Sequence, residues 1–144
     1  MIKAAKKITV TLGATLLASL LLSACTNGPA SDRAATETAA TQQAELVRVT
    51  AIYDLIIDFS LSKRSDADHA RKFIPTGAEL RTAVQKGDLA LDKAVESLQE
   101  RIDDHSKILR QALQRGNAYA KDFLAFYKEK TGRDYFEDAK TLQP

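Results

Sequence analysis

Two histidines stand among carboxylates, an arrangement that could hold a metal ion. His105 directly follows Asp103 and Asp104, and Arg101 precedes it by one helical turn. Ligands on one helix face lie three or four residues apart, whereas these two carboxylates are immediate neighbours of the histidine. The Arg101 guanidinium would also repel a cation. We therefore interpret His105 as a histidine at the edge of a helical core, satisfied by a partner on another helix or by water.

Other residue patterns for chemistry are equally weak. His69 lies near Asp66 and Asp68 at a predicted loop–helix junction, which is typical of a solvated cap region. The chain has one cysteine, no Gly-x-Ser-x-Gly turn, no phosphate-binding glycine loop and no EF-hand loop. The charged residues between positions 96 and 107 predict the solvated face of a helix. We expect a protein that is not an enzyme and needs no metal or cofactor.

The amino terminus has the anatomy of a signal peptide. Lys3, Lys6 and Lys7 form a basic region, and an uncharged, mostly apolar run over residues 8–22 follows. This run is shorter than the roughly 20 residues of a membrane-spanning helix. The next residues complete the sequence Leu22-Ser23-Ala24-Cys25. This sequence resembles the lipobox of bacterial lipoproteins, in which Leu, Ala or Ser, Gly or Ala, and Cys follow in that order.

The resemblance implies that residues 1–24 are removed by cleavage between Ala24 and Cys25, and that the Cys25 thiol is lipidated. Each buried acyl methylene contributes about 0.8 kcal/mol, so two or three chains would anchor the protein stably. In similar lipoproteins of Gram-negative bacteria, Asp after the cysteine favours the inner membrane. Thr26 stands there instead, which favours the outer membrane, facing the periplasm. The alternative is an ordinary secreted protein with a chance cysteine.

Cleavage would also change the charge of the chain. Three of the 21 basic residues and none of the 19 acidic residues lie in the signal, so the mature chain carries 18 − 19 = −1. The whole-chain charge of +2 is therefore a property of the targeting segment, and we expect no nucleic-acid partner. One lipidated cysteine allows no internal disulfide, so the mature domain must be held by its core alone.

The mature chain divides into a tether and a domain. Residues 25–43 are small and polar, which predicts a flexible tether, although its alanines could extend the next helix backwards. Apolar residues at steps of three and four predict a central helix over 45–62. Shorter helices are expected over 67–73, with Ser65 or Asp66 as N-cap, and from Pro75 to about Lys86.

The longest apolar pattern follows a stop signal at Gly87 and an expected N-cap at Asp88. From Leu91 to Phe126 it alternates steps of four and three, the spacing of a coiled-coil seam. Gly116 disfavours a helix there, but the pattern keeps its register, so we favour one long or gently bent helix over two. We expect this helix to end at Thr131-Gly132, followed by a final turn capped by Asp134. Residues 44–144 thus predict an all-α, antiparallel bundle of three or four helices.

Six of the nine aromatic residues lie in the last 26 positions: Tyr119, Phe123, Phe126, Tyr127, Tyr135 and Phe136. One interpretation is an aromatic cap that closes the core against the first helix. The other is an open aromatic groove that captures a partner helix. In a third arrangement, a small-residue strip at Ala112, Gly116 and Ala120 would line a ligand cavity.

The predicted function is therefore non-catalytic binding of a protein partner by a lipid-anchored bundle. In format the protein is similar to the small helical pilotin lipoproteins, which escort secretins to the outer membrane, although no residue motif supports that comparison. Immunity or exclusion lipoproteins, a lipid-binding protein and a structural envelope component remain alternatives. An exposed seam would favour a homodimer.

Overall fold

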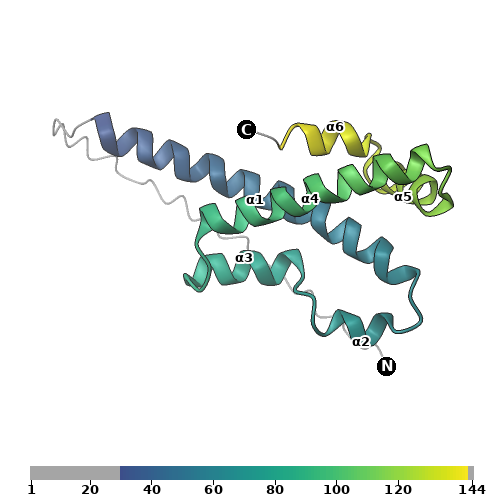
Figure 1. The fold of residues 1–144 in the computed structure, drawn as a ribbon. Helices are drawn as coiled ribbons and strands as arrows, with labels where there is room; N and C mark the ends of the chain where they lie inside the picture. Colours follow the sequence, from purple (N-terminus) through teal and green to yellow (C-terminus); the bar gives the residue numbers. More distant parts are fainter. Residues whose placement is uncertain (1–29, 143–144) are drawn as a thin grey trace, which may run out of the picture.

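The computed structural model describes residues 30–142, and for residues 30–35 it describes the backbone only. Its helices are α1 (Ala30–Ser62), α2 (Ala67–Arg71), α3 (Gly77–Lys86), α4 (Leu91–Gln114), α5 (Ala118–Thr131) and α6 (Tyr135–Lys140). Within this part of the chain there is no strand. Helix α1 crosses the whole molecule beside α4, with α3 on one side and α5 and α6 toward the other end (Figure 1). The predicted all-α, antiparallel bundle is confirmed.

The core lies between α1 and α4 and is closed by α5, α6 and Leu142, which follows α6. Each long helix presents an apolar residue to its neighbour once per turn, because steps of three and four keep the side chains on one face. The buried residues are Leu46, Val49, Ile52, Tyr53, Ile56 and Phe59 from α1, Ala94, Val95, Leu98, Ile102 and Leu109 from α4, and Ala120, Phe123, Tyr127, Tyr135, Ala139 and Leu142 beyond it.

The expectation of one continuous helix from Leu91 to Phe126 is wrong. Helix α4 ends at Gln114, and Gly116 adopts a left-handed backbone with φ of 71°. The amides of Gly116 and Asn117 donate to the carbonyls of Leu113 and Ala112 (both 2.9 Å), which is the Schellman arrangement. The Asn117 side chain then accepts from the Tyr119 amide and caps α5. The break costs little because its backbone groups are paired, and the apolar register resumes on a second helix.

Three other boundaries differ from expectation. Helix α1 begins at Ala30, so residues 30–43 of the expected tether are helical, in the way the alanines allowed. Helix α3 is capped by Thr76 and starts after Pro75, because the Thr76 side chain and Glu79 form a reciprocal capping box. The N-cap of α4 is Ala90 and not Asp88.

Several predicted stops and starts are confirmed. Gly87 and Gly132 end α3 and α5 in left-handed conformations with φ of 79° and 72°. The Asp134 carboxylate accepts from the amides of Phe136 and Glu137 and caps α6. Asp66 is the N-cap of α2, but it makes no side-chain cap bond. Its carboxylate instead pairs with Arg64 at 2.7 Å.

Candidate binding pocket

The short helix α3 is fastened to the middle of α1 by two hydrogen bonds. The Gly77 amide donates to an Asp54 carboxylate oxygen at 2.7 Å, and the Arg81 guanidinium donates to the Thr50 hydroxyl at 2.6 Å. Gly77 is buried because its backbone lies directly against α1. A side chain at this position would meet Asp54 and Thr50 at 3.0 Å or less, so glycine allows the close approach. This docking places the apolar face of α3 opposite α4.

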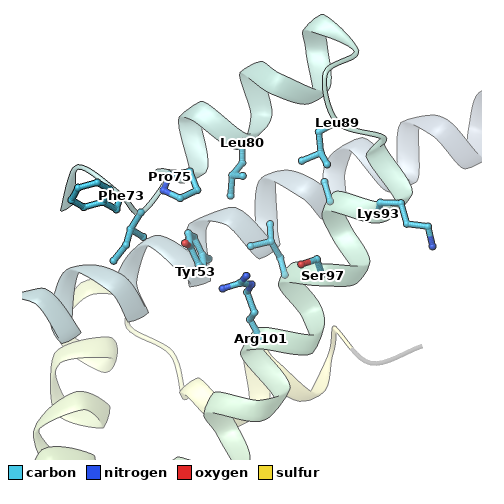
Figure 2. A pocket seen from close by; sticks show the side chains of 11 residues that line it. Tyr53, Phe73, Pro75, Leu80, Leu89, Lys93, Ser97 and Arg101 are labelled. Atoms are coloured by element: carbon cyan, nitrogen blue, oxygen red, sulfur yellow. The ribbon is translucent and has the colours of Figure 1, made fainter. Parts of the chain in front are cut away.

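A pocket of about 280 Å³ lies where α1, α3, α4 and the connection before α3 meet (Figure 2). The connection is short and non-helical because Pro75 disfavours helical geometry at Ile74. Most of the lining is apolar. The residues are Tyr53 from α1, Phe73, Ile74 and Pro75 from the connection, Leu80 from α3, Leu89 before α4, and Lys93, Ala94, Ser97, Leu98 and Arg101 from α4.

Three polar side chains of the lining make no hydrogen bond or ion pair in the part of the chain that the structure describes. They are the hydroxyls of Tyr53 and Ser97 and the guanidinium of Arg101. Figure 2 shows Arg101 extending from α4 toward Tyr53 on α1, with Ser97 one turn away on the same face. Tyr53 is only 6% exposed and forms part of the inner wall, whereas Ser97 and Arg101 are exposed at the mouth of the pocket. Burial raises the pKa of Tyr53 and the charge of Arg101 partly opposes this, so the hydroxyl remains a hydrogen-bond donor at neutral pH.

The charged residues that line the pocket are all cationic. Its lining contains two cationic residues and no carboxylate. The ammonium of Lys93 points outward in Figure 2 and pairs with Glu96 at 2.7 Å, so its charge is partly neutralised. Arg101 therefore supplies the uncompensated positive charge. An occupant that brings an anionic group beside an apolar one would suit both parts of this lining.

Phe73 extends the apolar surface beyond the pocket. It is 74% exposed, the largest exposed fraction among the exposed large apolar side chains of the described residues. The neighbouring His69 ring contacts it edge-on, at a centroid distance of 5.2 Å. Single exposed apolar residues are common, but this ring borders a concave apolar site. The pocket and the ring therefore form one continuous surface, which we call the Phe73 face.

The predicted role of His105 is confirmed. Its Nδ1 atom and the Tyr135 hydroxyl of α6 share a hydrogen bond of 2.8 Å, so the histidine has a partner on another helix. Burial lowers its pKa from 6.5 to about 4, which keeps the imidazole neutral. His69 is exposed on α2 as expected. Among the described residues, no three His, Cys, Asp or Glu side chains come together as a possible metal site.

The six C-terminal aromatic residues are mainly a core cap. Phe123, Tyr127 and Tyr135 are buried, and Tyr119, Phe126 and Phe136 are half-buried against the core. The Phe59 ring of α1 contacts Tyr119, Phe123 and Phe126 at centroid distances of 5.1–5.4 Å. Of the six rings of the possible partner surface, Phe123, Tyr127 and Tyr135 are therefore inaccessible in this fold, and Tyr119, Phe126 and Phe136 are partly accessible. The predicted small-residue strip is also interrupted, since Gly116 is exposed in the turn.

The lipobox lies outside the described residues, and with it Ala24, Cys25 and the predicted signal over residues 1–24. Between residues 30 and 142, no helix has both the length and the apolar character of a membrane span. Comparisons with protein-family models, with curated proteins and with solved structures found no match. The functional interpretation therefore depends on the residues themselves.

Sequence analysis missed the Phe73 face. The signal that could have indicated it is the run Phe73-Ile74-Pro75, three apolar residues placed where proline interrupts the helical pattern. Arg101 was assigned to a solvated charged face, and Arg101 and most of that face are exposed. Nothing in its spacing showed that its guanidinium lies beside Tyr53, because that proximity depends on how α1 and α4 are paired.

Proposed function

We propose that this chain is a lipid-anchored protein of the bacterial envelope that acts by binding a protein partner, not by catalysis. The sequence Leu22-Ser23-Ala24-Cys25 supports the anchor, and Thr26 supports the outer membrane, facing the periplasm. The observation that carries the binding role is the exposed Phe73 ring at the rim of the pocket. Aromatic anchors beside concave apolar sites are typical of protein interfaces.

The residues with catalytic potential support a binding role. The His105 imidazole is neutral, half-buried and hydrogen-bonded to Tyr135, so it is engaged in structure. The Tyr127 hydroxyl donates to Asp138 at 2.8 Å, and Arg133 pairs with that carboxylate at 2.6 Å. These titratable groups at the C-terminal end of the core are thus paired with one another, and no nucleophile–base pair of the described residues faces the pocket.

A rigid spacer would suit a tethered binding protein. Residues 30–43 extend α1 by 14 positions, about 21 Å at 1.5 Å per residue. The residues from Thr36 to Thr41 are exposed, so this part of α1 stands clear of the bundle. It would hold the Phe73 face at a distance from the lipid anchor on Cys25.

Site-specific photocrosslinking in the native host tests this function. A benzoyl-phenylalanine placed at position 73 should link the chain to one envelope protein. The same residue at position 108 is the control, because Ile108 is 65% exposed and lies outside the pocket. The identity of the linked protein would separate an assembly helper from an immunity or exclusion protein.

A matched pair of charge substitutions makes the test quantitative. Phe73→Glu should lower co-purification of that protein roughly tenfold or more, as expected for an interface hot spot. Ile108→Glu should leave it unchanged. Equal crosslinking from both positions, or equal co-purification by both variants, would contradict a binding role for the Phe73 face.

A further inference from the structure

The polar part of the pocket has the composition of a carboxylate site. Arg101 offers a planar array of N–H donors, which suits the two oxygens of a carboxylate. The Ser97 hydroxyl and the Tyr53 hydroxyl add two donors, and none of the three groups makes a hydrogen bond or ion pair with another described residue. The lining contains no carboxylate. Ser97 and Arg101 are exposed and hydrated when no occupant is bound, so an anionic occupant would replace this water with charge-assisted hydrogen bonds.

The volume of the pocket limits the size of the group that can bind in it. At about 280 Å³ the pocket lies just below the range of roughly 300–1,000 Å³ that small-molecule sites span. This volume suits one or two side chains better than a large cofactor. The Phe73 ring, 74% exposed, extends past the pocket and would stay uncovered by a ligand of that volume alone. An occupant that covers both must continue outside the pocket, as a polypeptide does.

Because Arg101 lies close to the apolar wall, a bound polypeptide segment must bring an anionic group and an apolar side chain to neighbouring positions. Neighbouring side chains of a strand point to opposite faces, and those of a helix diverge. An internal apolar residue and an adjacent acidic one would therefore not enter the same small pocket together. At a carboxyl terminus, however, the carboxylate is bonded to the same Cα that bears the side chain. A single terminal residue therefore brings both groups into the pocket, whereas an internal segment needs two residues on the same face.

From this geometry we propose that the pocket binds the carboxyl terminus of the partner polypeptide. The last side chain is apolar and packs against Leu80, Leu89 and Leu98, and the terminal carboxylate accepts from Arg101 with support from Ser97 and Tyr53. The residues before the terminus cross the Phe73 ring. This inference rests on the proposed function and adds the chemistry by which the partner is recognised.

Peptide binding to the purified full chain in lipid nanodiscs tests the proposal. The probes are fluorescein-labelled hexapeptides, Gly-Ser-Gly-Ser-Gly followed by Leu, Ile, Val, Met or Phe, each as the free acid and as the amide. At least one free acid should bind saturably, and its amide should bind roughly tenfold more weakly or worse, because a hydrogen-bonded charge is lost. Arg101→Gln should abolish this difference. Lys93→Gln removes the same charge at the outer rim and should preserve it.

Three outcomes would overturn the proposal. No free acid binding up to millimolar concentration would exclude capture of an apolar terminus. Equal affinity of acid and amide would exclude carboxylate recognition. Tighter binding of decanoate, with displacement of the peptides, would assign the pocket to a fatty acid. A specific crosslink from position 73 together with any of these results would leave the proposed function standing, whereas loss of the crosslink itself would remove that function.

Discussion

The Nδ1 atom of His105 on α4 lies 2.8 Å from the hydroxyl of Tyr135 on α6. The same hydroxyl donates to the Ile102 carbonyl and accepts from the Ser106 hydroxyl, both at 3.2 Å. These bonds join the last helix to the centre of α4. The imidazole ring also packs edge-on against Phe123 at 4.8 Å between centroids. The histidine is thus a structural residue whose neutral form the fold requires.

This relationship predicts a loss of stability in acid. Burial lowers the pKa of His105 to about 4 from 6.5, so below pH 6.5 the unfolded chain takes up the proton more readily than the folded one. The free energy of unfolding should be fully present above pH 6.5 and fall as the pH drops toward 4, by roughly 3 kcal/mol from this group. Urea unfolding between pH 7 and pH 4 measures it. His105→Gln should show a smaller fall, and parallel curves for the two proteins would contradict the prediction.

Phe123→Ala should be strongly destabilising. The ring is 0% exposed and contacts Phe59, His105 and Tyr135. Removing it leaves a cavity where three segments meet, at a cost of about 3–5 kcal/mol in the free energy of unfolding. Phe73→Ala is the matched control, because it deletes the same ring from an exposed site and should stay within about 0.5 kcal/mol. Similar urea midpoints for both variants would show that Phe123 is not in the core.

The sign of the change in the free energy of unfolding caused by Gly116→Ala distinguishes a break at this residue from a continuous helix. With φ of 71°, alanine at this position should cost about 1–2 kcal/mol, although there is open space for a Cβ. In a continuous helix the same change would stabilise the protein by about 1 kcal/mol. Gly116→Asn should be milder, since asparagine tolerates the left-handed region better. Chemical denaturation of the three proteins decides between the two arrangements.

Gly77→Ala should loosen α3 and the pocket together. A Cβ at this position would lie 2.5 Å from an Asp54 carboxylate oxygen and 2.8 Å from the Thr50 Cβ. We expect a loss of about 1–3 kcal/mol, as for other overpacked sites. Hydrogen exchange should rise in α3, because its docking bonds to α1 are displaced. Ala78→Ser changes the exposed neighbouring residue and should leave both measurements unchanged; an equal rise in that variant would refute close packing at Gly77.

Cys25→Ser should release the protein from membranes. Without the thiol no lipid is attached, and the acyl contribution of about 0.8 kcal/mol per methylene is lost. Fractionation of cells expressing each form, with detergent-free washes of the membranes, measures the change. Thr26→Asp is the companion variant, expected to keep the anchor but shift the protein to the inner membrane. If the serine form stays with the membranes, the lipobox interpretation is wrong.

The sequence was sufficient for the helical class and for several helix ends. Apolar steps of three and four are a local property, and they located the C-terminal part of α1 and the apolar face of α4 correctly. Gly87, Gly132 and Asp134 stop or start helices through bonds within a few residues of themselves, so they too could be identified in advance. At Gly116 the periodic pattern and the local signal disagreed. The local signal prevailed, because a paired turn preserves the register across two helices.

The contacts of His105 show which features the sequence could predict and which it could not. Its position in the apolar pattern predicted a partner on another helix, but not that the partner is Tyr135, 30 residues away. The same limit applies to the clustered aromatic residues. Their number near the carboxyl terminus was visible, yet which rings are buried depends on where Phe59 of α1 meets them.

By itself, the sequence determined the all-helical class and several of the helix stops and caps, since these depend on neighbouring residues, and it predicts the anchor at Cys25. Only the tertiary structure decided that Tyr53, Phe73 and Arg101 share one pocket. These residues come from three segments, and α3 reaches its place only because Gly77 allows close contact with α1. Such a site depends on long-range packing, which residue spacing along the chain does not encode.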